Sequence, residues 1–384
     1  MKKLLTLLMS ALVLAGVILP GAKAGPSPGG VSSDNVEWLK HVPFEVGTAT
    51  GSRLIGKYLY VTSWKNFSIY DVSDPENPNL LSITPFAADG STSEGFRFEN
   101  EDVETNGKIL IFSEETPRDQ LYIYNVEDKT NPTFLSLTPD AGGHTVTCIF
   151  KCKYLYGSTG NIVDIRDPLK PKVVGNWQKE VGLQGGSHDL TEVKPGFLLT
   201  APLSGPIQYL DARDPLHPKV LAQGMKPENT PIIHSVAWPR GGKDRWMLVQ
   251  AEKNFTPRCN EGGGGFMVFD TKGWQKSHTF KFVDQFKAVN GTFADGNPPA
   301  NGLGCSAHWF EVRDDWKDGG LVADGFYEHG SKFFTVDHNT GKIKEVGYME
   351  PIAGSTSADH WINHDIVYAI DYTRGIDILR YLDK

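Results

Sequence analysis

A histidine opens each of several short apolar runs in this chain, and their recurrence constrains the fold more than any other feature. The runs begin at His144, His188, His234, His308 and His360. After each comes a turn and a β-branched or aromatic run, and then usually a third run ending in aspartate. Four strands per unit at roughly 40–50 residues is the sequence period of a β-propeller. The pattern therefore predicts a scaffold that brings the five histidines to one place.

Two earlier units of the same form begin near Thr48 and Glu101 and lack the histidine. We count seven repeats and predict an all-β, seven-bladed β-propeller. Segment 36–44 resembles the last strand of a repeat, whereas the final repeat stops at a third strand, 375–380. The N-terminal strand is therefore expected to pair into the last blade, which would leave no open sheet edge at the junction.

The repeats resemble a known family. The resemblance rests on Leu59-Tyr60-Val61, Ser68-Ile69-Tyr70-Asp71-Val72-Ser73-Asp74-Pro75 and Asn161-Ile162-Val163-Asp164-Ile165-Arg166-Asp167-Pro168, which look like the LVIVD repeat of bacterial secreted and surface proteins. It extends over roughly 58–379 and implies a propeller without assigning an activity. A more distant likeness, in architecture only, is to the selenium-binding protein and methanethiol oxidase family, whose oxidase uses copper.

The N-terminus has the pattern of a secretory signal. A basic start, Met1-Lys2-Lys3, precedes an apolar stretch, 4–19, and a small-residue site at Ala22-Lys23-Ala24. We predict cleavage after Ala24, a flexible leader over 25–35 and a single propeller domain over 36–384. The alternative is a membrane anchor, but a spanning helix needs about 20 apolar residues. The mature protein is expected to be secreted or periplasmic, with no membrane span.

Four cysteines suit an oxidising compartment. Cys148 and Cys152 flank a short loop, so a disulfide between them is geometrically feasible. Cys259 and Cys305 would form the second pair. The alternative for these thiols is metal ligation, and Cys305 is close to His308 in sequence.

The first strand of each propeller blade lines the central channel. The five histidines and Glu101, which occupies the matching place in the second repeat, are therefore expected to meet at one mouth. Imidazoles with one carboxylate suit a transition metal, and copper, iron or zinc are the candidates. The long segment 286–304, rich in Asn, Gly and Pro, would shape access. The alternative is that the histidines are structural, copied with the repeat.

Two classes of function follow. The first is a metal-dependent oxidoreductase or hydrolase acting on a small molecule at the channel mouth, with no particular catalytic residue assigned. The second is a non-enzymatic binding propeller whose loop face receives a protein or surface ligand. A net charge of −8 argues against nucleic acid as a partner, and a monomer is expected. Two polar clusters follow strands, one of Asp324, Tyr327, Glu328 and His329 and one of Tyr372, Thr373 and Arg374. They are interpreted as solvated loops, with lining of the channel mouth as the alternative.

Overall fold

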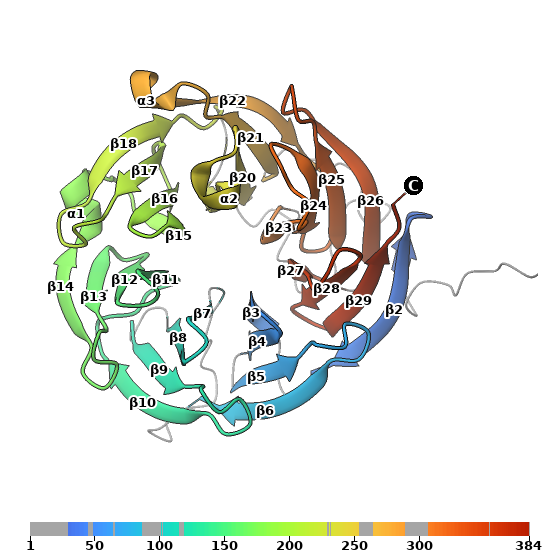
Figure 1. The fold of residues 1–384 in the computed structure, drawn as a ribbon, viewed down its shortest axis with the longest axis horizontal. Helices are drawn as coiled ribbons and strands as arrows, with labels where there is room; N and C mark the ends of the chain where they lie inside the picture. Colours follow the sequence, from blue (N-terminus) through green and yellow to red (C-terminus); the bar gives the residue numbers. More distant parts are fainter. Residues whose placement is uncertain are drawn as a thin grey trace, which may run out of the picture.

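The computed structural model is an all-β protein. It describes residues 30–44, 49–63, 66–86, 101, 103–114, 119–228, 230, 232–252, 264–288, 306–352 and 354–383. In Figure 1 the sheets stand around a central axis and extend outward from it. None of the helices in these ranges is long and apolar enough to cross a membrane.

Three sheets follow one plan, in which four antiparallel strands run outward from the axis in chain order. The first contains β3 (Ala49–Ile55), β4 (Tyr58–Ser63), β5 (Asn66–Asp71) and β6 (Asn79–Pro85). The second contains β7 (Glu104–Thr105), β8 (Ile109–Ser113), β9 (Leu121–Asn125) and β10 (Thr133–Thr138). The third contains β11 (Val146–Ile149), β12 (Tyr154–Gly157), β13 (Asn161–Asp164) and β14 (Lys172–Asn176).

The next two sets of strands follow the same plan but are joined into one 8-stranded sheet. One half contains β15 (Ser187–Lys194), β16 (Phe197–Pro202), β17 (Ile207–Asp211) and β18 (Lys219–Gly224). The other contains β19 (Ile232–Ala237), β20 (Trp246–Glu252), β21 (Phe266–Asp270) and β22 (Thr279–Phe286). The halves meet where β18 pairs with β22 in parallel, through Gln223 with Thr279 and Gly224 with Phe280.

Two further sheets complete the ring, and each receives a strand from the N-terminal part of the chain. One contains β23 (Phe310–Val312), β24 (Gly320–Gly325), β25 (Ser331–Val336), β26 (Ile343–Pro351) and β1 (Gly30–Ser32). The other contains β27 (Thr356–Trp361), β28 (Ile366–Asp371), β29 (Gly375–Tyr381) and β2 (Val36–Pro43). Short helices α1 (Trp177–Val181), α2 (Pro239–Gly242) and α3 (Trp274–Ser277) lie on connections.

The predicted closure by the N-terminal strand is confirmed. β2 pairs with β29 from Val36 opposite Tyr381 to Pro43 opposite Gly375. The Trp38 indole N–H also donates to Asp377 Oδ1 at 3.0 Å. β1 differs from the expectation of a flexible leader, because Gly30–Ser32 pairs with β26.

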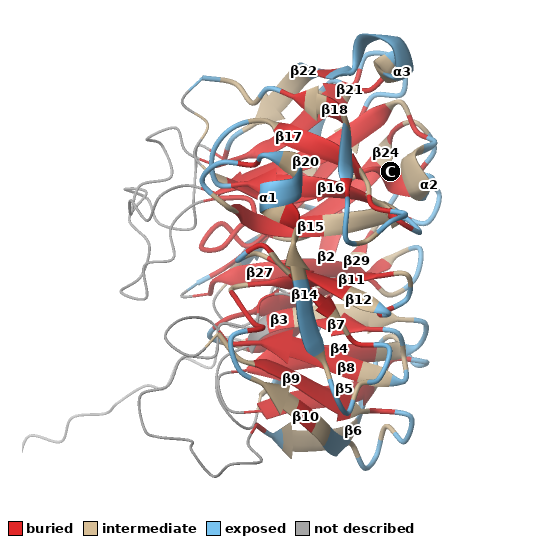
Figure 2. Cartoon of the chain, turned by 90° about the vertical axis from the view of Figure 1, so that its left-hand side faces the viewer, coloured by how far each residue is buried: buried red, intermediate tan, exposed pale blue. Residues whose placement is uncertain are grey.

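The core lies between neighbouring sheets. The middle strands are buried along most of their length, whereas exposed residues lie on outer strands and loops (Figure 2). One cluster joins Leu59 and Val61 of the first sheet to Tyr368 and Ile378 of the last. The face-to-face packing of sheets explains why the middle strands read as continuous apolar runs rather than alternating ones.

Asp-Pro turns provide a second link between sheets. In three of them the aspartate accepts a backbone hydrogen bond from the residue two positions later, as in Asp167 with Leu169 and Asp214 with Leu216, both at 3.1 Å. The carbonyl oxygen of the proline in such a turn also accepts a hydrogen bond from a tyrosine hydroxyl of the preceding sheet. Tyr156 donates in this way to Pro215 O at 2.7 Å.

Candidate metal centre

The candidate site lies at the N-terminal ends of the strands nearest the central axis. The strand register shifts around His188 in β15 and around His234 in β19, so each histidine occupies an extra position in its strand. Such a bulge turns a side chain out of the regular alternation and re-aims it. His144 and His308 lie just before β11 and β23, and Glu101 lies before β7.

Four imidazoles surround one carboxylate oxygen. Glu101 Oε2 lies 3.3 Å from Nε2 of His144 and 3.8 Å from Nε2 of His188. It lies 3.4 Å from Nε2 of both His234 and His308. His144 Nε2 and His188 Nε2 are 2.9 Å apart. The same nitrogen of each ring therefore faces one small volume.

The separations from Glu101 Oε2 to the imidazoles are long for hydrogen bonds and suitable for ligands of one ion. An N–H···O bond usually spans about 2.7–3.2 Å, and every distance from Glu101 Oε2 to an imidazole exceeds that range. Donors bound at about 2.0–2.1 Å lie roughly 2.9 Å apart in octahedral geometry and about 3.3–3.4 Å apart in tetrahedral geometry. Glu101, His188 and His234 offer ligand atoms that all lie within 4.8 Å of one another.

Burial sets the charges at the site. Burial, then the neighbouring His234, holds the pKa of His188 well below its usual value. Burial, then the nearby His308, lowers the pKa of His234 to about 3. Burial opposes ionisation of Glu101, but the surrounding imidazoles, with His308 and His144 first, leave its pKa well below the usual range. Neutral imidazoles and an ionised carboxylate are the forms that bind a metal ion.

The contacts behind the donors are uneven. His308 Nδ1 is bonded to Ser357 O at 2.7 Å. Tyr372 donates its hydroxyl to Glu101 Oε1, the oxygen away from the imidazoles, at 2.8 Å. Nδ1 of His188 and of His234 is buried without a hydrogen-bond partner in the described part of the chain. The orientation of Glu101 and His308 is thus fixed from behind.

Comparison with known proteins bears on the repeat and on the fold. Residues 47–84 match the family model described as the LVIVD repeat. The chain carries an LVIVD repeat. Raptor from Chaetomium thermophilum has a similar structure, with a TM-score of 0.58 and 13% identity over 90% of this chain and 30% of Raptor. The chain thus spans less than a third of Raptor, and this likeness concerns the fold alone. No curated protein matches the chain.

His360 does not join the other four histidines of this LVIVD-repeat propeller. The register of β27 shifts around Ser357, so Ser357 holds the place that His188 and His234 hold in their strands. His360 lies three residues further along the strand. There its Nδ1 is bonded to Glu311 Oε1 and its Nε2 to Ser52 Oγ, both at 2.6 Å. The prediction matched the repeats by placing histidine on histidine. The bulged positions show that Ser357, not His360, corresponds to His188 and His234.

The first of the two polar clusters interpreted as solvated loops is buried instead. In the second, Tyr372 is buried, whereas Thr373 is exposed and Arg374 is only partly buried. Asp324, Glu328 and His329 have 0–1% of their surface exposed. Tyr327 lies with its ring 4.5 Å from that of His308, and its hydroxyl donates to Glu252 at 2.9 Å. Burial, and then the charge of Glu101, raises the pKa of Glu252. No sequence feature pointed to Glu252, and the two tyrosines are predicted only as members of polar clusters in loops.

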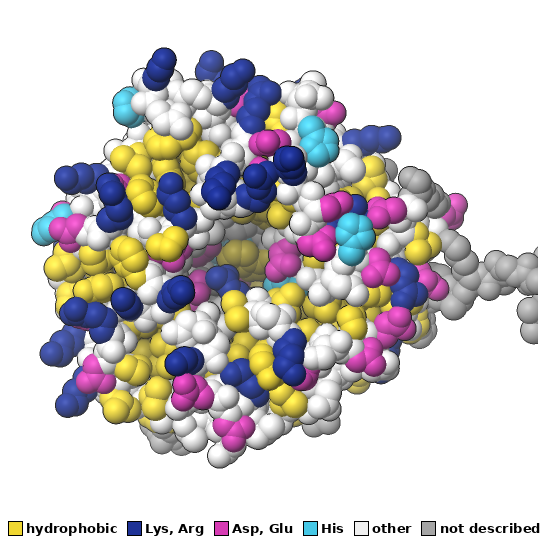
Figure 3. Space-filling view, viewed as in Figure 1, with side chains coloured by type: hydrophobic (Ala, Val, Ile, Leu, Met, Phe, Trp, Pro, Cys, Tyr) yellow, Lys and Arg dark blue, Asp and Glu magenta, His cyan; other side chains and the backbone are white. Residues whose placement is uncertain are grey.

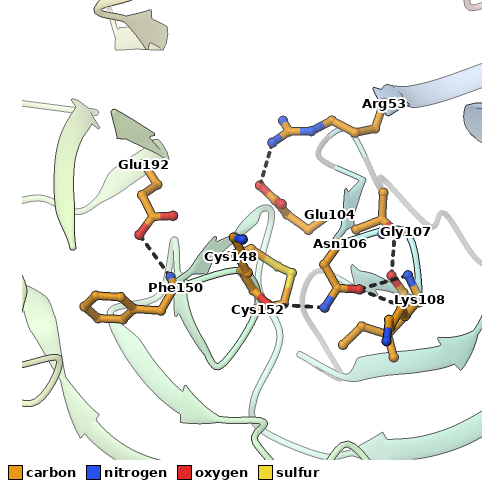
Figure 4. Close-up of a disulfide and its surroundings, with 12 residues drawn as sticks. Arg53, Glu104, Asn106, Gly107, Lys108, Cys148, Phe150, Cys152 and Glu192 are labelled. Carbon is orange, nitrogen blue, oxygen red and sulfur yellow. Dashed lines mark hydrogen bonds and ion pairs between the residues drawn. A yellow bond between two sulfur atoms is a disulfide. The ribbon is translucent and has the colours of Figure 1, made fainter. Parts of the chain in front are cut away.

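Cys148 and Cys152 form a disulfide, so their sulfur atoms are not thiolate ligands (Figure 4). Glu104 lies beside them, and Arg53 approaches Glu104 at 3.5 Å. The second predicted pair, Cys259 with Cys305, and most of the segment 286–304 lie outside the described residues.

The disulfide lines a cavity of about 440 Å³ in the channel. Lysine and arginine side chains gather around the central hollow of the face shown in Figure 3. Trp309 also lines the cavity, and its indole ring lies 4.9 Å from the ring of His234. The cavity and the histidine cluster therefore share this indole.

Proposed function

We propose that the chain is a seven-bladed propeller that binds one transition-metal ion, copper, iron or zinc, at the centre of its channel. The ligands are His144, His188, His234, His308 and Glu101, and His360 is not among them. The blade count treats the 8-stranded sheet as two blades, because β18 and β22 meet through only two residue pairs, next to the outer end of each half.

One observation carries the proposal. Nε2 of His308 is buried, faces Glu101 and has no hydrogen-bond partner in the described residues, while three other imidazoles face the same oxygen. Burying polar atoms without a partner costs about 1–3 kcal/mol each. A metal ion would offset that cost for the whole group at once. One carboxylate ligand would leave a divalent ion with a net charge of about +1, which a bound hydroxide or another anion could neutralise.

The alternative function is a binding propeller with structural histidines. In such a scaffold each imidazole is expected to bond to neighbouring backbone. His308 does so through Ser357 O, but Nδ1 of His188 and of His234 does not. This unevenness favours the metal centre.

An ion in this position would support an oxidoreductase or a hydrolase, because it would activate water, dioxygen or a polar group of a substrate. His144 is the most exposed of the four imidazoles, with 21% of its side chain accessible, against 0% for His234 and His308. A small molecule would therefore approach from the His144 side. Tyr372 would hold Glu101, and Tyr327 with Glu252 would supply polar hydrogens near His308.

The protein is proposed to act outside the cytoplasm, as a monomer that is released after cleavage following Ala24. The Cys148–Cys152 disulfide supports an oxidising compartment. N-terminal sequencing of the protein from the periplasm or medium tests this, and an intact Met1 start would contradict it.

Metal content, measured by mass spectrometry on untagged protein from its native compartment, tests the main proposal. We expect about one equivalent of copper, iron or zinc per chain. Absence of metal that persists after attempted loading with each ion would overturn it and leave the binding propeller as the function.

A further inference from the structure

A second constellation lies on the first strands of three sheets and shares no residue with the proposed metal centre. Ser52 Oγ is 2.6 Å from His360 Nε2, and His360 Nδ1 is 2.6 Å from Glu311 Oε1. The three side chains come from β3, β27 and β23, so three different sheets bring them together. Their order is hydroxyl, imidazole, carboxylate, with one imidazole nitrogen for each neighbour.

The carboxylate and the imidazole are held in place. Glu311 Oε2 accepts a hydrogen bond from the backbone N–H of Trp361 at 3.1 Å, and the Trp361 indole donates to Glu311 O at 3.2 Å. His360 is buried, with 6% of its surface exposed. An imidazole that donates its Nδ1 proton to Glu311 presents an unprotonated Nε2 to the Ser52 hydroxyl. This is the tautomer in which a histidine can remove a proton from serine.

A purely structural hydroxyl at this level behaves differently. Thr147 and Thr191 also lie on first strands, and their hydroxyls donate to backbone carbonyls of the next sheet, Leu190 O at 2.9 Å and Val236 O at 2.7 Å. Ser52 instead meets an imidazole that a third group orients, which is the geometry of an activated nucleophile. Ser52 is only partly buried, and 35% of the Glu311 side chain is exposed, so the group is reachable.

We propose that Ser52, His360 and Glu311 form a catalytic triad that hydrolyses small esters. Ser52 Oγ bonds to the ester carbonyl carbon while its proton passes to His360 Nε2. The bond from that carbon to the alcohol oxygen breaks, and the alcohol leaves with the proton from His360. Water, deprotonated by His360, then attacks the acyl-serine, which releases the carboxylic acid and restores the Ser52 hydroxyl. Glu311 stabilises the imidazolium throughout.

A cavity lies next to the triad and is lined by residues beside its members, not by Ser52, His360 or Glu311 themselves. Arg53, the residue after Ser52, lines the cavity of about 440 Å³, together with Ile55, Leu190 and Trp309. A compact ester with an apolar part matches that lining. The step uses no redox partner and no metal, so it is independent of the proposed metal centre.

The test uses the full chain, stripped of metal with EDTA, and a fluorescent alkyl fluorophosphonate, which reacts covalently with activated serines. We expect labelling that peptide mass spectrometry maps to Ser52, and hydrolysis of p-nitrophenyl acetate that falls at least about 100-fold in Ser52→Ala and in His360→Gln. Glu311→Gln should lose less, about 10-fold, because the imidazole keeps its place.

The matched control is Ser136→Ala, which removes an inter-sheet hydroxyl bond to Pro168 O at 2.7 Å, far from the triad. It should label and hydrolyse like the unaltered chain. Failure of the unaltered chain to label at Ser52, under conditions that label a known serine hydrolase, would overturn the triad whether or not the variants fold. Hydrolysis retained in folded Ser52→Ala would also overturn it. Neither result would affect the metal content of untreated protein.

Discussion

Two groups of first strands carry different chemistry at corresponding positions. One group is β11, β15, β19 and β23, and the other is β27 and β3. In the former, histidines lie at the inner ends and face Glu101. In the latter, Ser357 takes the bulged position, and the polar residues Ser52 and His360 lie further along the strands. The repeated unit therefore determines where a side chain points, and individual substitutions determine what it does.

The number of donors explains the division. A transition-metal ion takes four to six ligands, and four imidazoles with one carboxylate already supply five. With the proposed ion held by these five, the remaining positions of the ring would be free to change. Ser357 illustrates this, because its carbonyl now orients His308 instead of a side chain reaching the centre.

The largest expected effect comes from removing a donor. His234→Ala should lower bound metal from about one equivalent to less than about one tenth, since His234 is fully buried and its loss leaves a gap that water cannot easily fill. His360→Ala should keep its metal, because His360 is bonded to Glu311 and Ser52. Metal analysis of both purified variants, each checked for folding by circular dichroism, makes the comparison. Equal metal content in the two would end the distinction between the two regions.

A smaller effect is expected from the group behind Glu101. Tyr372→Phe removes the hydroxyl that donates to Glu101 Oε1, and loss of such a partner typically weakens metal binding by about 10–100-fold. Tyr327→Phe is the matched control, because its hydroxyl is bonded to Glu252 rather than to a proposed ligand. Competition with a chelator of known affinity gives both constants. A greater loss for Tyr327→Phe would make Glu252 the more important carboxylate.

The sequence predicted the repeat, the closing strand and four histidines that meet, because all three follow from strand period and from residue type at strand starts. It misplaced His360, since a one-residue bulge at Ser357 shifts which residue faces the axis and leaves no mark in composition. It also misjudged Tyr327 and Tyr372. They follow strands in a polar stretch, and only the packing of neighbouring sheets buries them.

The hairpin after His144 differs from the matching hairpins by its disulfide, and a stability effect of about 2 kcal/mol is expected from losing it. Cys148 and Cys152 are four residues apart, so the closed loop is short and its entropic contribution modest. The double variant Cys148→Ala, Cys152→Ala should show that loss in urea unfolding yet keep its metal. A loss of metal would indicate that the disulfide also positions His144.

The smallest expected effect concerns the boundary between the two regions, where Asp359 of β27 faces Asp324 of β24. Burial raises the pKa of Asp359 to about 8, with a further increase from Glu311, although Ser331 donates to Asp359 Oδ1 at 2.7 Å. Burial and the charge of Asp359 likewise raise the pKa of Asp324. Both carboxyls therefore favour the protonated form in the folded protein.

The sign of the pH dependence follows. Below about pH 3.8 the folded and unfolded chains both carry the Asp359 proton, and the group costs nothing. As the pH rises from there to about 8, only the unfolded chain releases it, so the folded state loses stability progressively. The Asp359→Asn side chain cannot ionise. Its free energy of unfolding, relative to that of the unaltered chain, should therefore rise by about 1 kcal/mol between pH 4 and pH 8. The rise is smaller than the full cost of the raised pKa because the new amide buries its own N–H groups. Urea unfolding at both pH values measures the difference, with the exposed Asp74→Asn as the control. A gain that is equal at both pH values would show that Asp359 ionises in the folded protein as it does in the unfolded chain, which would contradict the raised pKa.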